Sequence, residues 1–229
     1  MKKTIIIAVS IVLAGAMLPV SVARLKSYDR TVDVKGLCEK EVHADKVIWP
    51  LTYKVVGNDL NAALREIESD NAVVMSFLRD GGVADADITV KAPDISDKYA
   101  SEYGNNDRVY RYLCTCVITV CTSDVDKVLS LQTKLSDLMK KGIALTTNDW
   151  QNQTQFKFEA LNDIKPEMIE EATANAREAA RKFAQDSGSR LGKIKTATQG
   201  TFSIEDRDTN TPYIKKVRVV TYVTYYLNR

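Results

Sequence analysis

Residues 108–122 read RVYRYLCTCVITVCT, and this stretch decides the class of fold. Successive side chains of a β-strand point to opposite faces, so an alternating apolar pattern marks a strand with one buried face. The odd positions mix polar side chains with Val117, whereas the even positions from 110 to 120 are apolar. The even face, which we expect to meet the core, carries Tyr110, Tyr112, Cys114, Cys116, Ile118 and Val120.

Similar patterns on both sides of this stretch predict further strands. They lie at residues 31–37, 46–56, 88–92, 155–161, 193–203 and 213–227. Pro50 cannot donate a ladder hydrogen bond, so we expect it at an edge or a bulge. Residues 38–45 are polar and are expected to form a bulged strand or a turn, and residues 93–107 a polar hairpin loop.

Three helices are predicted between these strands. The first follows the candidate capping residues Asn58 and Asp59 and ends at Gly81-Gly82, and its apolar residues recur at helical spacing. The second follows Ser123 or Asp124 as its cap and ends at Gly142. The third covers about residues 163–190 and has an alanine-rich face that lets it lie close to a sheet.

The order of elements is therefore ββαββαβαββ. Long strands in adjacent pairs imply antiparallel hairpins with helices on one face. The sequence thus predicts an α+β fold, in which an antiparallel sheet of long strands carries three packed helices. Residues 24–229 are expected to form this one domain.

The first 23 residues have the anatomy of a targeting segment. Lys2 and Lys3 precede an uncharged apolar stretch, residues 4–23, and Ser21 and Ala23 are the small residues of a cleavage site. The stretch is also near the ~18–20 residues that span a bilayer. Two alternatives remain, a signal peptide cleaved after Ala23 and an uncleaved anchor in the inner membrane. Either one places the body in the periplasm.

Composition and charge exclude several classes of protein. Of the 229 residues 45% are hydrophobic and 27% charged, which excludes a disordered, collagen-like or polytopic membrane protein. The chain has 32 Lys and Arg against 30 Asp and Glu, and the first 23 residues hold two lysines and no acid, so the body is formally neutral. A neutral body offers no electrostatic footprint for nucleic acid.

No motif for catalysis or for a cofactor is recognised. His43 is the single histidine, which excludes a histidine-rich zinc site and leaves no second imidazole for a nucleophile relay. Four carboxylates cluster around the expected short strand, and we expect them to lie in a solvated loop. They are Asp85, Asp87, Asp94 and Asp97. We therefore predict no catalytic, cofactor-binding or metal-binding residues, and a protein that is not an enzyme.

The four cysteines leave a thiol question open. Cys114 and Cys116 point to the same side of one strand, about 7 Å apart, which is too far for an unstrained bridge. Cys38 lies on the same face of its strand as Val34, and we expect it to face the core beside Cys114 and Cys116. Cys121 lies on the opposite face of its strand from Cys114 and Cys116. Buried free thiols are the main expectation. A cross-strand disulfide of Cys38 and a redox or metal site are the alternatives.

The terminal strand suggests self-association. Tyr222, Tyr225 and Tyr226 make it apolar on both faces, as expected for a central core strand or for an assembly surface. About 15 residues at ~3.3 Å each extend ~50 Å, whereas a body of this size is only ~35 Å across. Part of such strands would expose apolar surface or a free edge, and we therefore expect a homo-oligomer. The alternative is a monomer, in which bulges fold the long strands back over their own helices.

Two stretches resemble a known family. The first comprises Val34-Lys35-Gly36, Glu39-Lys40-Glu41-Val42 and Trp49-Pro50-Leu51. The second comprises Ala176-Arg177-Glu178-Ala179-Ala180 and the glycines at 188 and 192 before a strand. Both are similar to bacterial SIMPL-domain proteins over about residues 30–229. The resemblance implies a periplasmic or envelope protein of unsettled function, able to oligomerise and sometimes linked to stress tolerance, without a catalytic residue set.

The expected function is that of a non-enzymatic envelope protein that assembles with itself and with possible envelope partners. It would need no cofactor and would touch the membrane only through residues 4–23, if these are retained. A thiol-based redox or metal-handling protein is the alternative, and an enzyme that uses the loop carboxylates is a third hypothesis.

Overall fold

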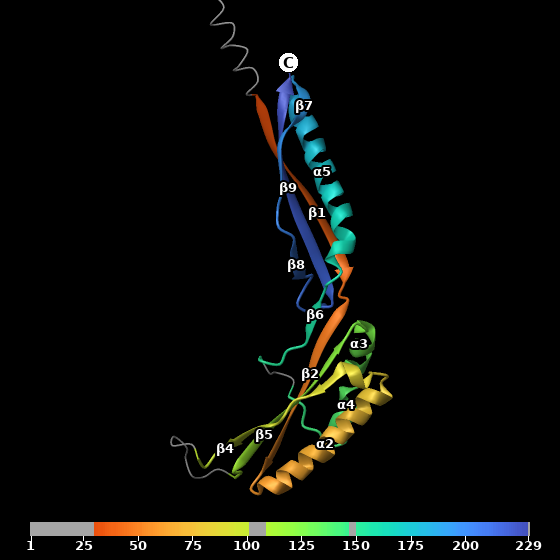
Figure 1. The fold of residues 1–229 in the computed structure, drawn as a ribbon, viewed down its shortest axis with the longest axis vertical. Helices are drawn as coiled ribbons and strands as arrows, with labels where there is room; N and C mark the ends of the chain where they lie inside the picture. Colours follow the sequence, from red (N-terminus) through yellow and green to blue (C-terminus); the bar gives the residue numbers. More distant parts are fainter. Residues whose placement is uncertain (1–29, 101–108, 147–149, 229) are drawn as a thin grey trace, which may run out of the picture. The chain divides into compact units, whose positions relative to one another are not determined.

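The strands form two antiparallel sheets, which belong to two compact units (Figure 1). The computed structural model describes residues 30–100, 109–146 and 150–228. Unit 1 comprises Met1–Lys40, Asn162–Glu205 and Lys216–Arg229, and unit 2 comprises Glu41–Leu161 and Asp206–Lys215. The predicted α+β class is confirmed, and the described residues form two sheets in place of one and four α-helices in place of three.

The sheet of unit 1 has the strand order β1-β9-β7, and β8 pairs with β9. These strands are β1 (Thr31–His43), β7 (Arg190–Gln199), β8 (Ser203–Asp206) and β9 (Ile214–Asn228). β9 is central in this sheet, as expected, but only one of its two faces is buried. The first predicted strand continues to His43, and the strand predicted at residues 193–203 begins earlier, at Arg190.

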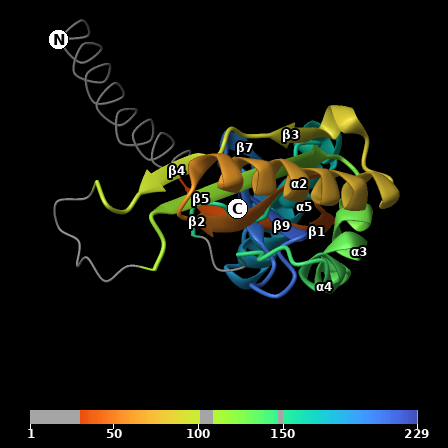
Figure 2. The same ribbon diagram turned by 90° about the horizontal axis from the view of Figure 1, so that it is seen from below.

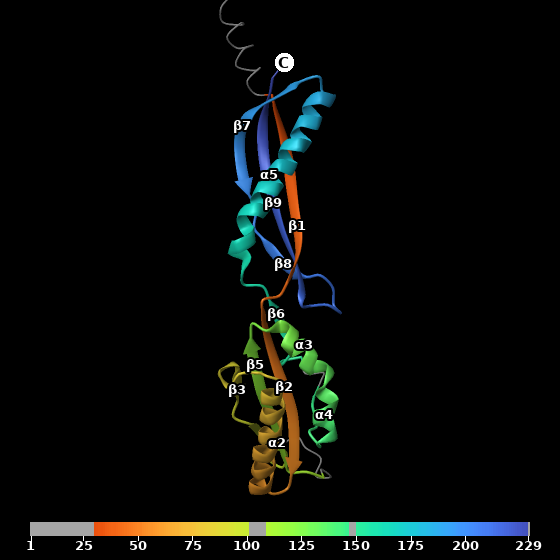
Figure 3. The same ribbon diagram turned by 90° about the vertical axis from the view of Figure 1, so that its right-hand side faces the viewer.

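One helix, α5 (Leu161–Asp186), lies along one face of this sheet (Figure 3). It buries Met168 and four alanines spaced four residues apart, the predicted small-residue face. The same close approach requires Gly36 of β1, because a Cβ there would lie 1.8 Å from the carbonyl oxygen of Ala172. Gly188 has φ +62°, a left-handed conformation that suits glycine after the helix end.

The sheet of unit 2 has the order β3-β5-β2-β6, and β4 pairs with β5. Its strands are β2 (Lys46–Gly57), β3 (Ile88–Val90), β4 (Asp94–Asp97), β5 (Tyr112–Thr122) and β6 (Gln155–Lys157). The register of β2 on β5 runs from Val47 opposite Thr122 to Gly57 opposite Tyr112. β6 pairs only with Lys46–Ile48, so Pro50 lies just beyond that pairing, as its missing donor requires.

Three helices belong to unit 2: α2 (Leu60–Asp80), α3 (Val125–Thr133) and α4 (Leu135–Lys140). α2 packs on β2 and β5 (Figure 2). Its N-cap Asp59 accepts a hydrogen bond from the Ala62 N–H at 2.7 Å, as predicted. The single helix expected before Gly142 is divided at Lys134, whose N–H bonds the Leu131 carbonyl three residues back. The Thr133 hydroxyl also donates to a backbone carbonyl, which favours a break in the helix.

The pairing of neighbouring strands was predicted wrongly in one place. β1 and β2 follow each other in the chain but lie in different sheets, so they do not form a hairpin. β1 instead pairs with β9, and the Leu227 N–H reaches the Arg30 carbonyl at 2.8 Å. β4 also lies within residues that were expected to form a loop.

The larger core belongs to unit 2 and contains Trp49, Tyr53, Leu78 and Ile118, each nearly inaccessible to solvent. The even face of β5 contributes to it from Cys114 to Val120, which confirms the alternation there. The strand begins at Tyr112 rather than at residue 108, and Tyr110 before it is 50% exposed, so its expected place in the core is wrong. No helix among the described residues is both long and apolar enough to cross a membrane. The predicted targeting segment, residues 1–23, lies outside the described residues.

Candidate functional site

The cysteines divide between the units. Cys38, Cys114 and Cys116 are buried and Cys121 is exposed, as their strand parities predicted. Cys114 and Cys116 belong to the core of unit 2, whereas Cys38 lies in unit 1 beside Glu171 of α5. The expectation that the three are core neighbours is therefore wrong. All four are free thiols, so Cys38 has no disulfide.

The surroundings of the buried thiols disfavour the thiolate. Burial, followed by the hydrogen bond that the Cys38 thiol donates to Glu171 at 3.2 Å, raises the pKa of Cys38 to about 11. Burial also raises the pKa of Cys114 and of Cys116. Because the thiolate is the nucleophile and the metal ligand, this geometry does not favour thiol chemistry at these three positions.

The four loop carboxylates are not gathered in one cleft. Asp85 pairs with Arg79 at 2.7 Å, and Asp97 on β4 pairs with Arg111 at 2.9 Å. The Arg111 hydrogen bond holds the pKa of Asp97 below its usual range. Asp87 and Asp94 line two different surface hollows. Nothing in this arrangement resembles an acid–base pair.

His43 is exposed, as predicted, with its ring 6.4 Å from that of Tyr213. Within the described ranges no group of three or more Cys, His, Asp or Glu side chains is placed to hold a metal ion.

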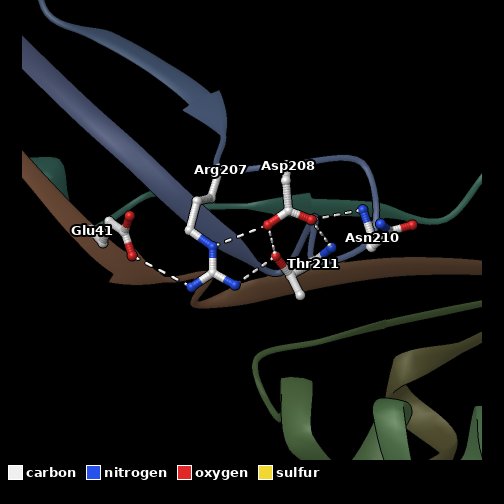
Figure 4. A network of polar contacts seen from close by, with 5 residues as sticks. All are labelled: Glu41, Arg207, Asp208, Asn210 and Thr211. Atoms are coloured by element: carbon white, nitrogen blue, oxygen red, sulfur yellow. Dashed lines mark hydrogen bonds and ion pairs between the residues drawn. The ribbon is translucent and has the colours of Figure 1, made fainter.

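A network of polar side chains closes the turn between β8 and β9 (Figure 4). Asp208 accepts hydrogen bonds from the backbone N–H groups of Asn210 and Thr211, each at 2.8 Å, and also from the Thr211 hydroxyl. Arg207 donates to Asp208 at 3.0 Å and reaches Glu41 at 3.4 Å. The Thr211 hydroxyl, followed by Arg207, lowers the pKa of Asp208. Since every group is paired within the network, its role is to fix the turn.

One surface of unit 1 has no covering layer among the described residues. α5 packs on the face of the sheet that carries Val34, Val223 and Tyr225. We call the opposite face the outer face. It is formed by Asp33, Lys35, Leu37 and Glu39 of β1 with Lys216, Arg218, Val220, Tyr222 and Thr224 of β9.

Contacts across the two strands order the outer face. The Thr224 hydroxyl donates to Asp33 at 2.6 Å, and the Lys35 ammonium lies 5.1 Å from the ring centroid of Tyr222. At the other end Glu39 pairs with Lys216 at 2.9 Å and with Arg218 at 3.3 Å.

These pairs imply a register that sets Leu37 opposite Val220. Leu37 is 41% exposed and Tyr222 45% exposed, so an apolar centre lies between two charged ends.

The tyrosines of β9 divide between the two faces. Tyr222 belongs to the outer face, whereas Tyr225 is only 2% exposed and packs in the core beside α5. An assembly surface that uses both side chains is therefore excluded. Leu37 was missed as a surface residue, although its parity with Asp33 and Lys35 on β1 was visible in the sequence.

The comparisons with known proteins identify the family. No curated protein is similar enough to the chain to count as a match. The family model SIMPL, described as a protein of unknown function (DUF541), matches residues 32–224. This range includes β1, α5 and nearly all of β9, together with both stretches that carried the resemblance. The chain therefore belongs to the SIMPL family.

Proposed function

We propose that the chain is a non-enzymatic protein of the cell envelope that assembles with a second copy of itself through the outer face of unit 1. The observation that carries the proposal is the apolar centre of that face, formed by Leu37, Val220 and Tyr222. It lies on a sheet whose other face already carries α5. Apolar surface that no layer covers is typical of an interaction site.

The charges of the outer face suit a second copy. A two-fold axis near Leu37 would place the apolar centres against each other. It would also bring Lys35 of each copy toward Glu39 of the other. Such an interface is isologous, because each copy contributes the same patch. Together with β7, the two strands of the outer face make three strands ~4.8 Å apart and about ten residues long, a flat area of roughly 480 Å² per copy. The total of about 960 Å² for two copies is close to the roughly 1,000 Å² at which specific interfaces begin.

The free edge of β1 is less suited to pairing than the face. The side chain of Asn175 on α5 donates to the Leu37 carbonyl at 2.9 Å. A bond of this kind occupies a carbonyl that an added strand would need, and it is one way in which proteins protect sheet edges. We therefore assign the assembly to the face rather than to the edge.

Light scattering coupled to size-exclusion chromatography tests the assembly. Residues 24–229 should elute with the mass of a dimer or a larger closed assembly at micromolar concentration. The double variant Leu37→Ser, Tyr222→Ser should shift this mass toward that of a monomer. Val90→Ser is the matched control, because Val90 is a similarly exposed apolar residue (47%) in unit 2. A monomeric wild type, or a double variant that assembles as the control does, would refute the proposal.

The proposed location rests on residues 1–23 and has its own test. We propose export to the periplasm with the segment either removed after Ala23 or retained as an inner-membrane anchor. The intact mass of the protein isolated from the envelope fraction distinguishes the two forms. Recovery of most of the protein in the cytoplasm with its N-terminus intact would contradict export.

A role in tolerance of envelope stress is tested by comparing survival of cells with and without the protein.

A further inference from the structure

A basic groove lies on the helix-covered side of unit 1, opposite the outer face. It has a volume of about 400 Å³ and opens to solvent between α5 and β7. Arg177 and Arg181 are four residues apart and therefore lie on the same side of α5. The complete lining consists of Arg177, Arg181, Leu191, Gly192, Lys193, Ile194 and Tyr225.

The groove carries positive charge that no ion pair among the described residues neutralises. No carboxylate is among its lining residues, and no ion pair there involves Arg177, Arg181 or Lys193. Like charges four residues apart on a helix repel each other, so the pair of arginines is unfavourable without a bound anion. Guanidinium groups are rigid planar forks that match the oxygens of phosphate and carboxylate groups.

A second, independent feature lies in the same groove. The hydroxyl group of Tyr225 is buried and has no hydrogen-bond partner, and the residue as a whole is only 2% exposed. A buried polar group without a partner destabilises the fold, so most such groups in native proteins are paired. Tyr225 is itself a lining residue of the groove, so an anion that displaces the side chains covering its hydroxyl would give that hydroxyl an acceptor.

We propose that this groove binds a phosphate monoester that carries an apolar stem. A phosphate monoester has three acceptor oxygens and a charge close to −2 near neutral pH, which suits three cations and a hydroxyl donor. A carboxylate has only two oxygens and one charge. Leu191 and Ile194, which is 43% exposed, offer the apolar surface for the stem.

Calorimetric titration of the full chain in a neutral detergent tests the assignment at constant ionic strength. Hexyl phosphate should bind at least about tenfold more tightly than either inorganic phosphate, which has no stem, or hexanoate, which is a carboxylate. Equal affinity for hexyl phosphate and inorganic phosphate would refute the claim that the groove binds an apolar stem. Equal affinity for hexyl phosphate and hexanoate would refute the preference for phosphate over carboxylate. Dihexanoyl phosphatidic acid shows whether the natural phosphate monoester is a lipid or a small soluble ester. If it binds more tightly than hexyl phosphate, the ligand is a lipid, and if it binds more weakly, the ligand is a small phosphate ester.

Variants separate binding from folding. Arg177→Gln with Arg181→Gln should weaken the binding of hexyl phosphate about tenfold or more. Lys182→Gln is the matched control, because Lys182 is the next residue of α5, is exposed and does not line the groove. Tyr225→Phe removes only the unpaired hydroxyl, so the affinity should fall several-fold while the melting temperature stays constant or rises. A fall in melting temperature with unchanged affinity would show a structural role and overturn the site.

Discussion

Replacement of Gly36 by alanine tests the packing on which unit 1 depends. A Cβ at this position would lie 1.8 Å from the carbonyl oxygen of Ala172 and 2.6 Å from the nitrogen of Ala176. Ordinary contacts begin at 3.4 Å, so α5 would have to retreat from β1 by about 1.6 Å. Both clashing atoms belong to the helix backbone, and no change of side-chain rotamer can relieve the overlap.

The expected cost follows from this displacement. A gap of only 0.5–1 Å already forfeits roughly a quarter to a half of a dispersion contact. The buried alanines of α5 and Met168 would lose contacts of this kind along the whole helix. Overpacking typically costs about 1–3 kcal/mol, and because backbone meets backbone here we expect about 3 kcal/mol or more in the free energy of unfolding of unit 1.

Urea unfolding measured by circular dichroism provides the assay, with Gly57→Ala as the matched control. Gly57 is also a strand residue with a negative φ, and its added Cβ would meet the Cβ of Ala63 at an ordinary 3.7 Å. The control should change the stability by less than about 1 kcal/mol. Both tryptophans, Trp49 and Trp150, lie in unit 2, so their fluorescence should report a nearly unchanged transition. Equal unfolding midpoints for the two variants would refute the reasoning.

Three further predictions concern single side chains. Native alkylation should modify Cys121 first. The pKa of Cys38 is raised from 9.0 to about 11, which lowers its thiolate fraction about 100-fold at neutral pH. Fast labelling of Cys38 should therefore begin only as the pH approaches 11. A second thiol that reacts as fast as Cys121 would contradict the structure. Asp45→Ala removes the acceptor of the Ala160 N–H at 2.7 Å and should lower the free energy of unfolding by about 1–2 kcal/mol in denaturant titrations. Asp59→Ala should cost about 1 kcal/mol through loss of the α2 cap, whereas Asn61→Ala beside it should be nearly neutral by the same measurement.

Local features of the fold could be predicted because their signal is local. The apolar alternation in residues 114–120 matches the alternation of buried side chains along β5. Asp59 and Asp124 cap their helices, since each side chain accepts a hydrogen bond from a backbone N–H of the first turn. The pairing of strands could not be predicted in the same way. β1 and β2 follow each other directly, yet β1 pairs with β9 at the far end of the chain. No local pattern identifies such a long-range partner, so one sheet was predicted where the structure has two.

The candidate surfaces were only partly visible in the sequence. Tyr222 and Tyr225 are three residues apart on one strand and must face opposite sides, so their division could have been predicted. The spacing of Arg177 and Arg181 likewise indicates one side of a helix. What the sequence does not contain is the position of Tyr225 in the groove beside them, because that depends on how closely α5 approaches the sheet.

The small residues of α5 account for both proposed sites of unit 1. The four buried alanines and Gly36 bring the helix backbone close to β1, and side chains of that size contribute little apolar area. Large and charged side chains must then lie at the margins of the contact, where Arg177, Arg181 and Ile194 line the groove. Unit 1 has a thin core, because a single closely packed helix covers its sheet, whereas unit 2 has the larger core. Contacts on the outer face therefore raise the stability of unit 1 by a larger share than similar contacts would raise that of unit 2. Binding of a second copy there would stabilise unit 1 by mass action, since only the folded sheet presents Leu37 beside Tyr222.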